Sequence, residues 1–282
     1  MMHELGAFYA AHSNLINQVG INALLALSIW VTLSCGQLSL GNMGFMAIAA
    51  YSSVLLVKDA HWPFAAAVLV GSVAAALAGL ILGWPVLRLR GVFLAIATIG
   101  FGEIVRIFAV NLDITGGAEG INGVPPLTTP FIVYCSLGVT LFLLWRLRCS
   151  RAGRAYAAIA QDEVAAEGLG IDTTAYKLSA FTLGAFVAGY GGALAAFASY
   201  FIGPSDFGFG KAVDMLTYAV AGGIDALGGP VLGAALLTVL PEVLRFLQNY
   251  RDIANGLVLL LVIVFLPSGL WSAFSLLHKR AA

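Results

Sequence analysis

The sequence has few charged residues for its length. Only 10% of its 282 residues are Asp, Glu, Lys or Arg, whereas a soluble domain carries about 25%. Hydrophobic residues make up 60%, and the mean hydropathy is +0.95. Fourteen basic and fourteen acidic residues cancel, so the composition gives no reason to expect a nucleic acid or an acidic substrate as partner. These proportions predict an all-α, polytopic membrane protein.

Patterns typical of metal, disulfide and nucleotide sites are also missing. The three cysteines, Cys35, Cys135 and Cys149, have no CxxC spacing and no nearby pair of histidines, so we expect apolar packing residues rather than a metal site. No GxxxxGK[ST] phosphate loop is present, so we expect no nucleotide hydrolysis and no cofactor bound by this chain. The four histidines lie outside the apolar runs, which argues against an intramembrane enzyme.

Long apolar runs predict the transmembrane helices, because about 20 apolar residues cross the hydrocarbon core as a helix. The start, Met1 to Asn14, has no basic residue before the first run and no cleavage signature, so we expect that run to be retained. The runs are Leu15 to Ser34, Leu38 to Val57, Phe64 to Leu87, Val92 to Leu112, Phe131 to Leu147, Leu178 to Ile202, Gly229 to Leu247 and Ile253 to Trp271, with a shorter ninth candidate from Ala212 to Ile224. We therefore predict a single transmembrane domain over residues 1–282 with about eight or nine spans.

The positions of Lys and Arg predict the orientation, because basic residues near span ends stay on the cytoplasmic side. Those assigned to the inner side are Arg88, Arg90, Arg146, Arg148, Arg151, Arg154, Lys177, Lys279 and Arg280. The loop from Asn111 to Pro130 has neither Lys nor Arg, so we place it outside. An inner C-terminus then requires the short ninth segment to cross, and counting backwards places the N-terminus outside.

One substantial polar stretch lies on the predicted inner side, at about residues 148–177. Its part from Arg154 to Glu167 is rich in alanine, which favours a helix, and glycines follow where that helix would stop. Asp172 or Thr173 could cap the helix that enters the membrane at Leu178. The stretch is interpreted either as an ordinary connector or as a short cytoplasmic helix, between the fifth and sixth spans, that docks a partner.

Small and polar residues inside the spans have two interpretations. A ridge at four-residue spacing in the sixth span favours close helix packing; it consists of Ala180, Gly184, Ala188, Gly192 and Ala196. Glycine interruptions with polar neighbours indicate either tight turns or a cavity that forms the translocation pathway. The candidate pathway residues are Gln37, Ser39, Gly41, Asn42, Gly222 and Gly223.

Two pairs of opposite charges stand at i, i+3 spacing within apolar runs. Glu103 and Arg106 lie in the fourth span, and Glu242 and Arg245 lie in a late one. Such pairs normally turn into the bundle, since a lone charge in the membrane is costly. We predict structural pairs rather than a proton relay.

Several ordered stretches resemble the branched-chain amino acid permeases of ABC importers. They are GQLSLGNMGFMAIAAYSS from Gly36, RLRGVFLAIATIGFGEIVR from Arg88, TGGAEGINGVP from Thr115, GRAYAAIAQDEVAAEGLGIDTTAYKLSAF from Gly153 and AGGIDALGGPVLGAALLTVLPEVLRF from Ala221. The SLG stretch resembles the second, M-type subunit of the two that pair in these systems. Members of that type often carry a further hydrophobic N-terminal segment, which Met1 to Asn14 does not supply.

The resemblance implies a permease subunit of the bacterial inner membrane that imports branched-chain or related neutral amino acids by alternating access. Its implied partners are a second homologous permease, two cytoplasmic ATPase subunits and an external solute-binding protein. The residues matching the family's ATPase-coupling segment are Gly153, Arg154, Ala158, Asp162, Glu163, Ala165, Ala166, Gly168 and Gly170. Gln161 departs from it, standing where a charged residue is frequent. Urea, short amides or sugars remain alternative solutes, and an ion-coupled secondary transporter is the alternative of another class.

Overall fold

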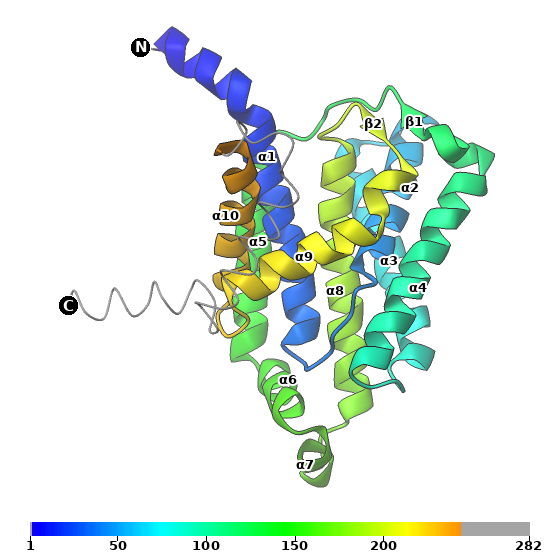
Figure 1. The fold of residues 1–282 in the computed structure, drawn as a ribbon, viewed down its shortest axis with the longest axis vertical. Helices are drawn as coiled ribbons and strands as arrows, with labels where there is room; N and C mark the ends of the chain where they lie inside the picture. The colour runs from blue at the N-terminus through cyan, green and yellow to red at the C-terminus, as the bar shows by residue number, and fades with distance from the viewer. Residues whose placement is uncertain (1, 244–282) are drawn as a thin grey trace, which may run out of the picture.

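The computed structural model describes residues 2–243 as a bundle of helices. Figure 1 shows most of them running along the long axis, with two short helices, α6 and α7, below one end. The expected span from Ile253 to Trp271, the basic residues Lys279 and Arg280, and Arg245 lie outside the described residues.

Within residues 2–243, five helices are long and apolar enough to cross a membrane, in agreement with an all-α membrane bundle. They are Ser13–Leu33 within α1 (Met2–Leu33), α3 (Phe64–Val86), α4 (Val92–Asn111), α5 (Pro130–Cys149) and α8 (Thr173–Ala196). Helices α3, α4 and α5 expose most of their apolar side chains, whereas α1 and α8 are mostly buried. The least apolar of these five helices therefore lie inside the bundle, and the most apolar ones form its surface.

Helix α8 packs against α1, α2 and α3 through the predicted ridge of small residues. All five ridge positions are buried. A Cβ added at Gly184 would lie 2.8 Å from Thr32 Cγ2 and 3.0 Å from Ser28 O, and one at Gly192 would lie 2.6 Å from Met46 O. Side chains at these positions would push the helices apart, so the packing interpretation of the ridge is confirmed.

The second predicted span is interrupted more strongly than the sequence suggested. Helix α2 begins only at Asn42 (Asn42–Lys58), and the chain from residue 34 to 41 is not helical. Leu40 N donates to Thr98 Oγ1 at 3.1 Å. Thr98 lies six residues inside α4, about 9 Å along its axis at 1.5 Å per residue. The segment at residues 34–41 therefore enters the bundle before α2 starts, and the second span, predicted from Leu38 to Val57 with glycine interruptions, becomes helical only at Asn42.

The late helices depart from a regular antiparallel arrangement. Helix α9 (Phe209–Gly222) crosses the long axis obliquely and α10 (Gly229–Val243) returns beside α1. Between them the chain turns through Gly223, whose φ of +103° suits glycine, and Gly229 approaches so closely that a Cβ would collide with Gly223 O. The glycines predicted to interrupt this region thus form a compact turn between two helices.

The two ends of the bundle differ in character. One end carries the α4–α5 connection, with two 3-10 turns (Asp113–Thr115 and Gly117–Glu119) and strand β1 (Ile121–Asn122). Strand β1 pairs antiparallel with β2 (Phe201–Ile202), which leads through a third 3-10 turn, η3 (Pro204–Phe207), into α9. The other end carries α6 and α7 (Figure 1). The sixth span accordingly ends at Ala196, before the predicted limit of Ile202.

Candidate functional site

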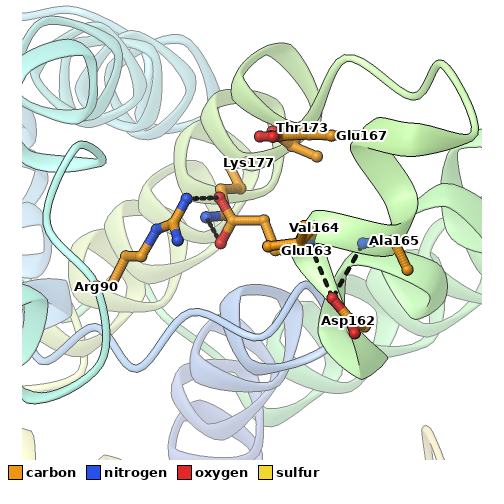
Figure 2. Close-up of polar contacts among 8 residues, drawn as sticks. All are labelled: Arg90, Asp162, Glu163, Val164, Ala165, Glu167, Thr173 and Lys177. Carbon is orange, nitrogen blue, oxygen red and sulfur yellow. Dashed lines mark hydrogen bonds and ion pairs between the residues drawn. The ribbon is translucent and has the colours of Figure 1, made fainter.

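The polar stretch after α5 forms two short helices rather than one. Helix α6 covers Arg151–Gln161 and α7 covers Glu163–Gly168. Asp162 separates them in an extended conformation, and its Oδ1 accepts hydrogen bonds from Val164 N (2.9 Å) and Ala165 N (3.0 Å), as Figure 2 shows. Capping at Asp162 favours a new helix start over continuation. The single helix expected from Arg154 to Glu167 is therefore corrected to a helix, a cap and a second helix.

The predicted end and restart of helix in this region are confirmed. Helix α7 stops at Gly168, and Gly170 follows with a φ of +81°. Asp172 caps α8 by accepting a hydrogen bond from Ala175 N at 3.0 Å, and Thr173 is the first helical residue. Helix α8 therefore begins several residues before the apolar run does.

Glu163 fastens α7 to the bundle through two basic residues. Its Oε2 lies 2.5 Å from Lys177 Nζ on α8, and its Oε1 lies 3.4 Å from Arg90 Nη2 in the α3–α4 connection. Figure 2 shows the Glu163 carboxylate between these two cations. The side chains of Lys177 and Glu163 are 10% and 23% exposed, whereas that of Arg90 is 66% exposed. The contact with Lys177 is therefore the better shielded and the stronger of the two.

Further contacts hold both short helices to α8. Thr173 Oγ1 donates to Glu167 Oε1 at 2.8 Å. Tyr156 and Ser179 share a 2.8 Å hydrogen bond between hydroxyl groups. Burial raises the pKa of Tyr156, so its hydroxyl stays protonated in this contact. A displacement of α6 or α7 would thus act directly on the first turns of α8.

Helix α6 touches one interrupted part of the bundle and lies across a cleft from another. A Cβ on Gly36 would lie 3.0 Å from Ala160 Cα, so the end of α6 rests against the segment at residues 34–41. Arg148 Nη2, at the end of α5, donates to Asp225 O at 2.8 Å in the α9–α10 turn, and Trp30 Nε1 donates to Ile224 O at 2.7 Å. A cleft of about 260 Å³ lies between these groups and α6.

The nine residues matched to a coupling segment divide into exposed and packed positions. Arg154, Asp162, Ala165, Gly168 and Gly170 are exposed. Gly153, Ala158, Glu163 and Ala166 are partly or fully buried. The packed positions shape the two helices and leave the exposed ones to meet any partner.

Two exposed apolar side chains of this segment were missed by the sequence reasoning. Val164 is 66% exposed and Leu169 is 81% exposed, both within or next to α7. The sequence predicted one continuous helix through residue 162. That helix gave no basis for assigning these two side chains to an exposed face. These two side chains are available for contact with another protein.

The candidate pathway residues fall into two separate places. Gln37, Ser39 and Asn42 are buried at the entry to α2, at 1%, 0% and 1% exposure, beside Gly41. Asn42 Nδ2 donates to Ser28 Oγ at 2.7 Å, while both amide atoms of Gln37 lack a hydrogen-bond partner among the described residues. Gly222 is the last residue of α9 and Gly223 begins the turn to α10. A translocation role for either place stays a prediction.

The charge pair predicted in the fourth span is present. Arg106 Nε lies 2.7 Å from Glu103 Oε2. Their side chains are 35% and 31% exposed, so the pair lies at the edge of the bundle rather than turned fully into it. Glu242 forms contacts of its own, while its predicted partner Arg245 lies outside the described residues.

Cys35 is buried as expected, but Cys135 and Cys149 are exposed on α5, where the packing role expected for them is not seen.

Comparisons with known proteins agree with this architecture. Residues 11–266 match the family model described as branched-chain amino acid transport system / permease component. The chain is 34% identical over 287 aligned residues to the high-affinity branched-chain amino acid transport system permease proteins LivM of Salmonella typhimurium and Escherichia coli, covering 89% of this chain and 66% of each relative. It is 31% identical to the autoinducer 2 import system permease protein LsrC of Yersinia pseudotuberculosis, over 71% of this chain and 60% of that protein.

The chain thus spans slightly less than two thirds of the length of these curated relatives. No solved structure matches it. The family model nevertheless covers most of the chain, and the helical bundle with its apolar surface fits a membrane permease. The chain belongs to the family of branched-chain amino acid transport system permease components.

Proposed function

We propose that this chain is the transmembrane permease subunit of an ATP-driven importer for branched-chain or related neutral amino acids. The observation that carries the proposal is the pair of short helices at one end of the bundle, fixed to it by Glu163 and presenting Val164 and Leu169 outward. Membership of the family supplies the solute class, since the relatives are named for branched-chain amino acid transport. The chain would bind no cofactor itself and would take its energy from separate ATPase subunits.

In this proposal the end with α6 and α7 faces the cytoplasm. Basic residues gather there, including Arg88, Arg90, Arg148 and Arg154, as expected for an inner side. The loop at residues 111–130, at the other end, would face outward. Helices α2, α9 and α10 would add three shorter crossings to the five long ones, giving eight, and the run from Ile253 to Trp271 would make the ninth. The N-terminus would then lie outside and the C-terminus inside.

Coupling would run from α6 and α7 into the bundle by rigid contact. An ATPase that moved α7 would move Lys177 on α8 through Glu163, and one that moved α6 would press Ala160 against Gly36. Both routes end at interrupted or glycine-rich parts of the bundle, where small displacements change a packing arrangement most easily. A second permease subunit would pack on part of the apolar outer surface, and an external binding protein would deliver the solute.

The docking role is tested by co-purification of ATPase subunits with this chain after Leu169→Asp. A buried carboxylate at an interface costs several kcal/mol, so we expect at least about a tenfold loss of retained ATPase. Ile114→Asp is the matched control, because Ile114 is 72% exposed at the opposite end of the bundle. Equal retention of ATPase by both variants would contradict the docking role of α7.

Two alternatives remain distinguishable. The relative named for autoinducer 2 import indicates that the family carries other solutes, so uptake should be compared among leucine, urea, short amides and sugars. An ion-coupled carrier needs an ionisable acid within the spans that is free to bind the ion. Glu103 is paired with Arg106, which makes this acid a poor site for a coupling ion.

A further inference from the structure

A polar cleft lies at the end of the bundle opposite α6 and α7. It has a volume of about 700 Å³ and is lined by α1, α9, α10 and the connection between α8 and α9. Ligand sites for small molecules commonly measure about 300–1,000 Å³. In the part of the chain that the structure describes, the cleft is lined by none of the pathway residues suggested by the sequence.

A lysine and an amide form the polar centre of this cleft. Lys211 Nζ, near the start of α9, donates to Asn22 Oδ1 on α1 at 3.1 Å. Asn22 Nδ2 in turn donates to Thr238 Oγ1 on α10 at 3.0 Å, and Asn22 is only 8% exposed. An ammonium group can donate three hydrogen bonds, and the one recorded with Asn22 leaves capacity for a further acceptor. A cation held among membrane helices is costly unless it has a function or a partner.

The same cleft contains groups of the opposite sign and an apolar wall. Asp206 and Asp214 line it, the second lying one helical turn from Lys211 on α9. Its apolar lining includes Ile21, Met46 and Leu237, all less than 8% exposed. An α-amino acid with a hydrocarbon side chain has a carboxylate, an ammonium group and an apolar side chain. The cation, the carboxylates and the apolar wall of the cleft complement these three parts in turn.

We propose that this cleft binds the transported amino acid as a zwitterion on its way into the membrane. The solute carboxylate meets Lys211, its ammonium group meets the carboxylates of Asp206 and Asp214, and its side chain lies against Ile21 and Leu237. The inference rests on the proposed function and adds to it the site of solute recognition. The alternative is a purely structural lysine whose charge is balanced by the nearby Asp214 and Asp206, and such a lysine would respond neither to the solute nor to access from outside.

The first experiment measures ATP-driven leucine uptake in proteoliposomes that contain the assembled transporter with its binding protein. Lys211→Met should lower uptake at least about tenfold, the equivalent of one lost charged hydrogen bond, and Lys211→Arg should restore most of it. Lys58→Met is the matched control, because Lys58 lies at the same end of the bundle, donates to Asn122 O and is absent from the cleft lining. Co-purification with the partner subunits verifies assembly of each variant.

The second experiment probes the cleft without depending on transport. Ser199→Cys, on the cleft lining, is labelled with an anionic and a cationic thiosulfonate after the three native cysteines are replaced by serine. Lys211→Met should lower the anionic-to-cationic rate ratio several-fold, because a nearby charge acts within a screening length of about 8–10 Å. Leucine should slow labelling at residue 199. Ile114→Cys, exposed at the same end but outside the cleft, should show neither effect.

The outcomes distinguish a failure of the proposed function from a failure of the cleft as the solute site. Wild-type vesicles that take up no leucine would overturn the proposed function. If Lys211→Met takes up leucine normally while the wild type is active, the cleft is not the solute site, and the proposed function is unaffected. A labelling rate at residue 199 that changes neither with leucine nor with the charge at residue 211 would also contradict solute binding in the cleft. Loss of uptake together with leucine protection and a changed rate ratio supports it.

Discussion

The fastening of α7 by Glu163 allows a quantitative prediction about stability. Glu163→Gln keeps the shape of the side chain but removes its charge, which leaves Lys177, at 10% exposure, without its carboxylate. Breaking a fully buried pair costs about 3–5 kcal/mol, and breaking an exposed one costs about 0–1 kcal/mol. Partial shielding at 10% and 23% exposure places this substitution between them, at about 1–3 kcal/mol.

Double-mutant cycles separate the two contacts of Glu163. The coupling free energy between Glu163→Gln and Lys177→Met should be about 1–2 kcal/mol, because the two groups are close and shielded. The coupling with Arg90→Met should stay below about 0.5 kcal/mol, since Arg90 is 66% exposed and lies 3.4 Å away.

The assay is equilibrium unfolding of the purified protein in mixed micelles, with ATP-driven uptake measured in parallel. Glu119→Gln, at the other end of the bundle, is the control and should change the free energy of unfolding by less than about 0.5 kcal/mol. A larger coupling with Arg90 than with Lys177, or no cost for Glu163→Gln, would refute this account of how α7 is held.

Three further predictions concern packing, the pathway and orientation. Gly184→Ala should destabilise the protein by about 1–3 kcal/mol through its clash with Thr32, while Gly100→Ala, which meets no atom within 4 Å, should be neutral or stabilising in the same unfolding assay. Gln37→Leu removes an amide without a partner among the described residues, so the fold should tolerate it; if Gln37 contacts the solute, uptake should fall, and unchanged uptake would exclude that role. A cysteine at residue 119 should react with an impermeant reagent from outside and one at residue 161 should not, and the reverse pattern would invert the topology.

Much of the bundle could be predicted because lipid imposes simple rules. Apolar length located α3, α4 and α5 to within a few residues, and the spacing of Gly184 and Gly192 identified the buried face of α8. The structure departs from these rules where polar side chains bond to the backbone or over long range. Asp162 breaks the helix predicted from Arg154 to Glu167 by capping α7.

The contacts of the site depend on residues distant in the sequence. Glu163 reaches Arg90, 73 positions away, and Lys211 reaches Asn22, 189 positions away. Local composition carries no signal for such pairs. The exposed Val164 and Leu169 were missed for a related reason, since their outward direction depends on the cap at Asp162.

The burial of α1 and α8 beneath more apolar helices has a consequence for biosynthesis. A helix that carries glycines and polar side chains gains less from lipid than α3 does, so the translocation machinery inserts it less readily than α3. The surfaces that receive α8, on α1, α2 and α3, are all made earlier in the chain. We therefore expect α8 to become stable in the membrane only after these helices have gathered, so that a damaged ridge on α8 would be recognised by quality control as a failure to insert, before any transporter is assembled.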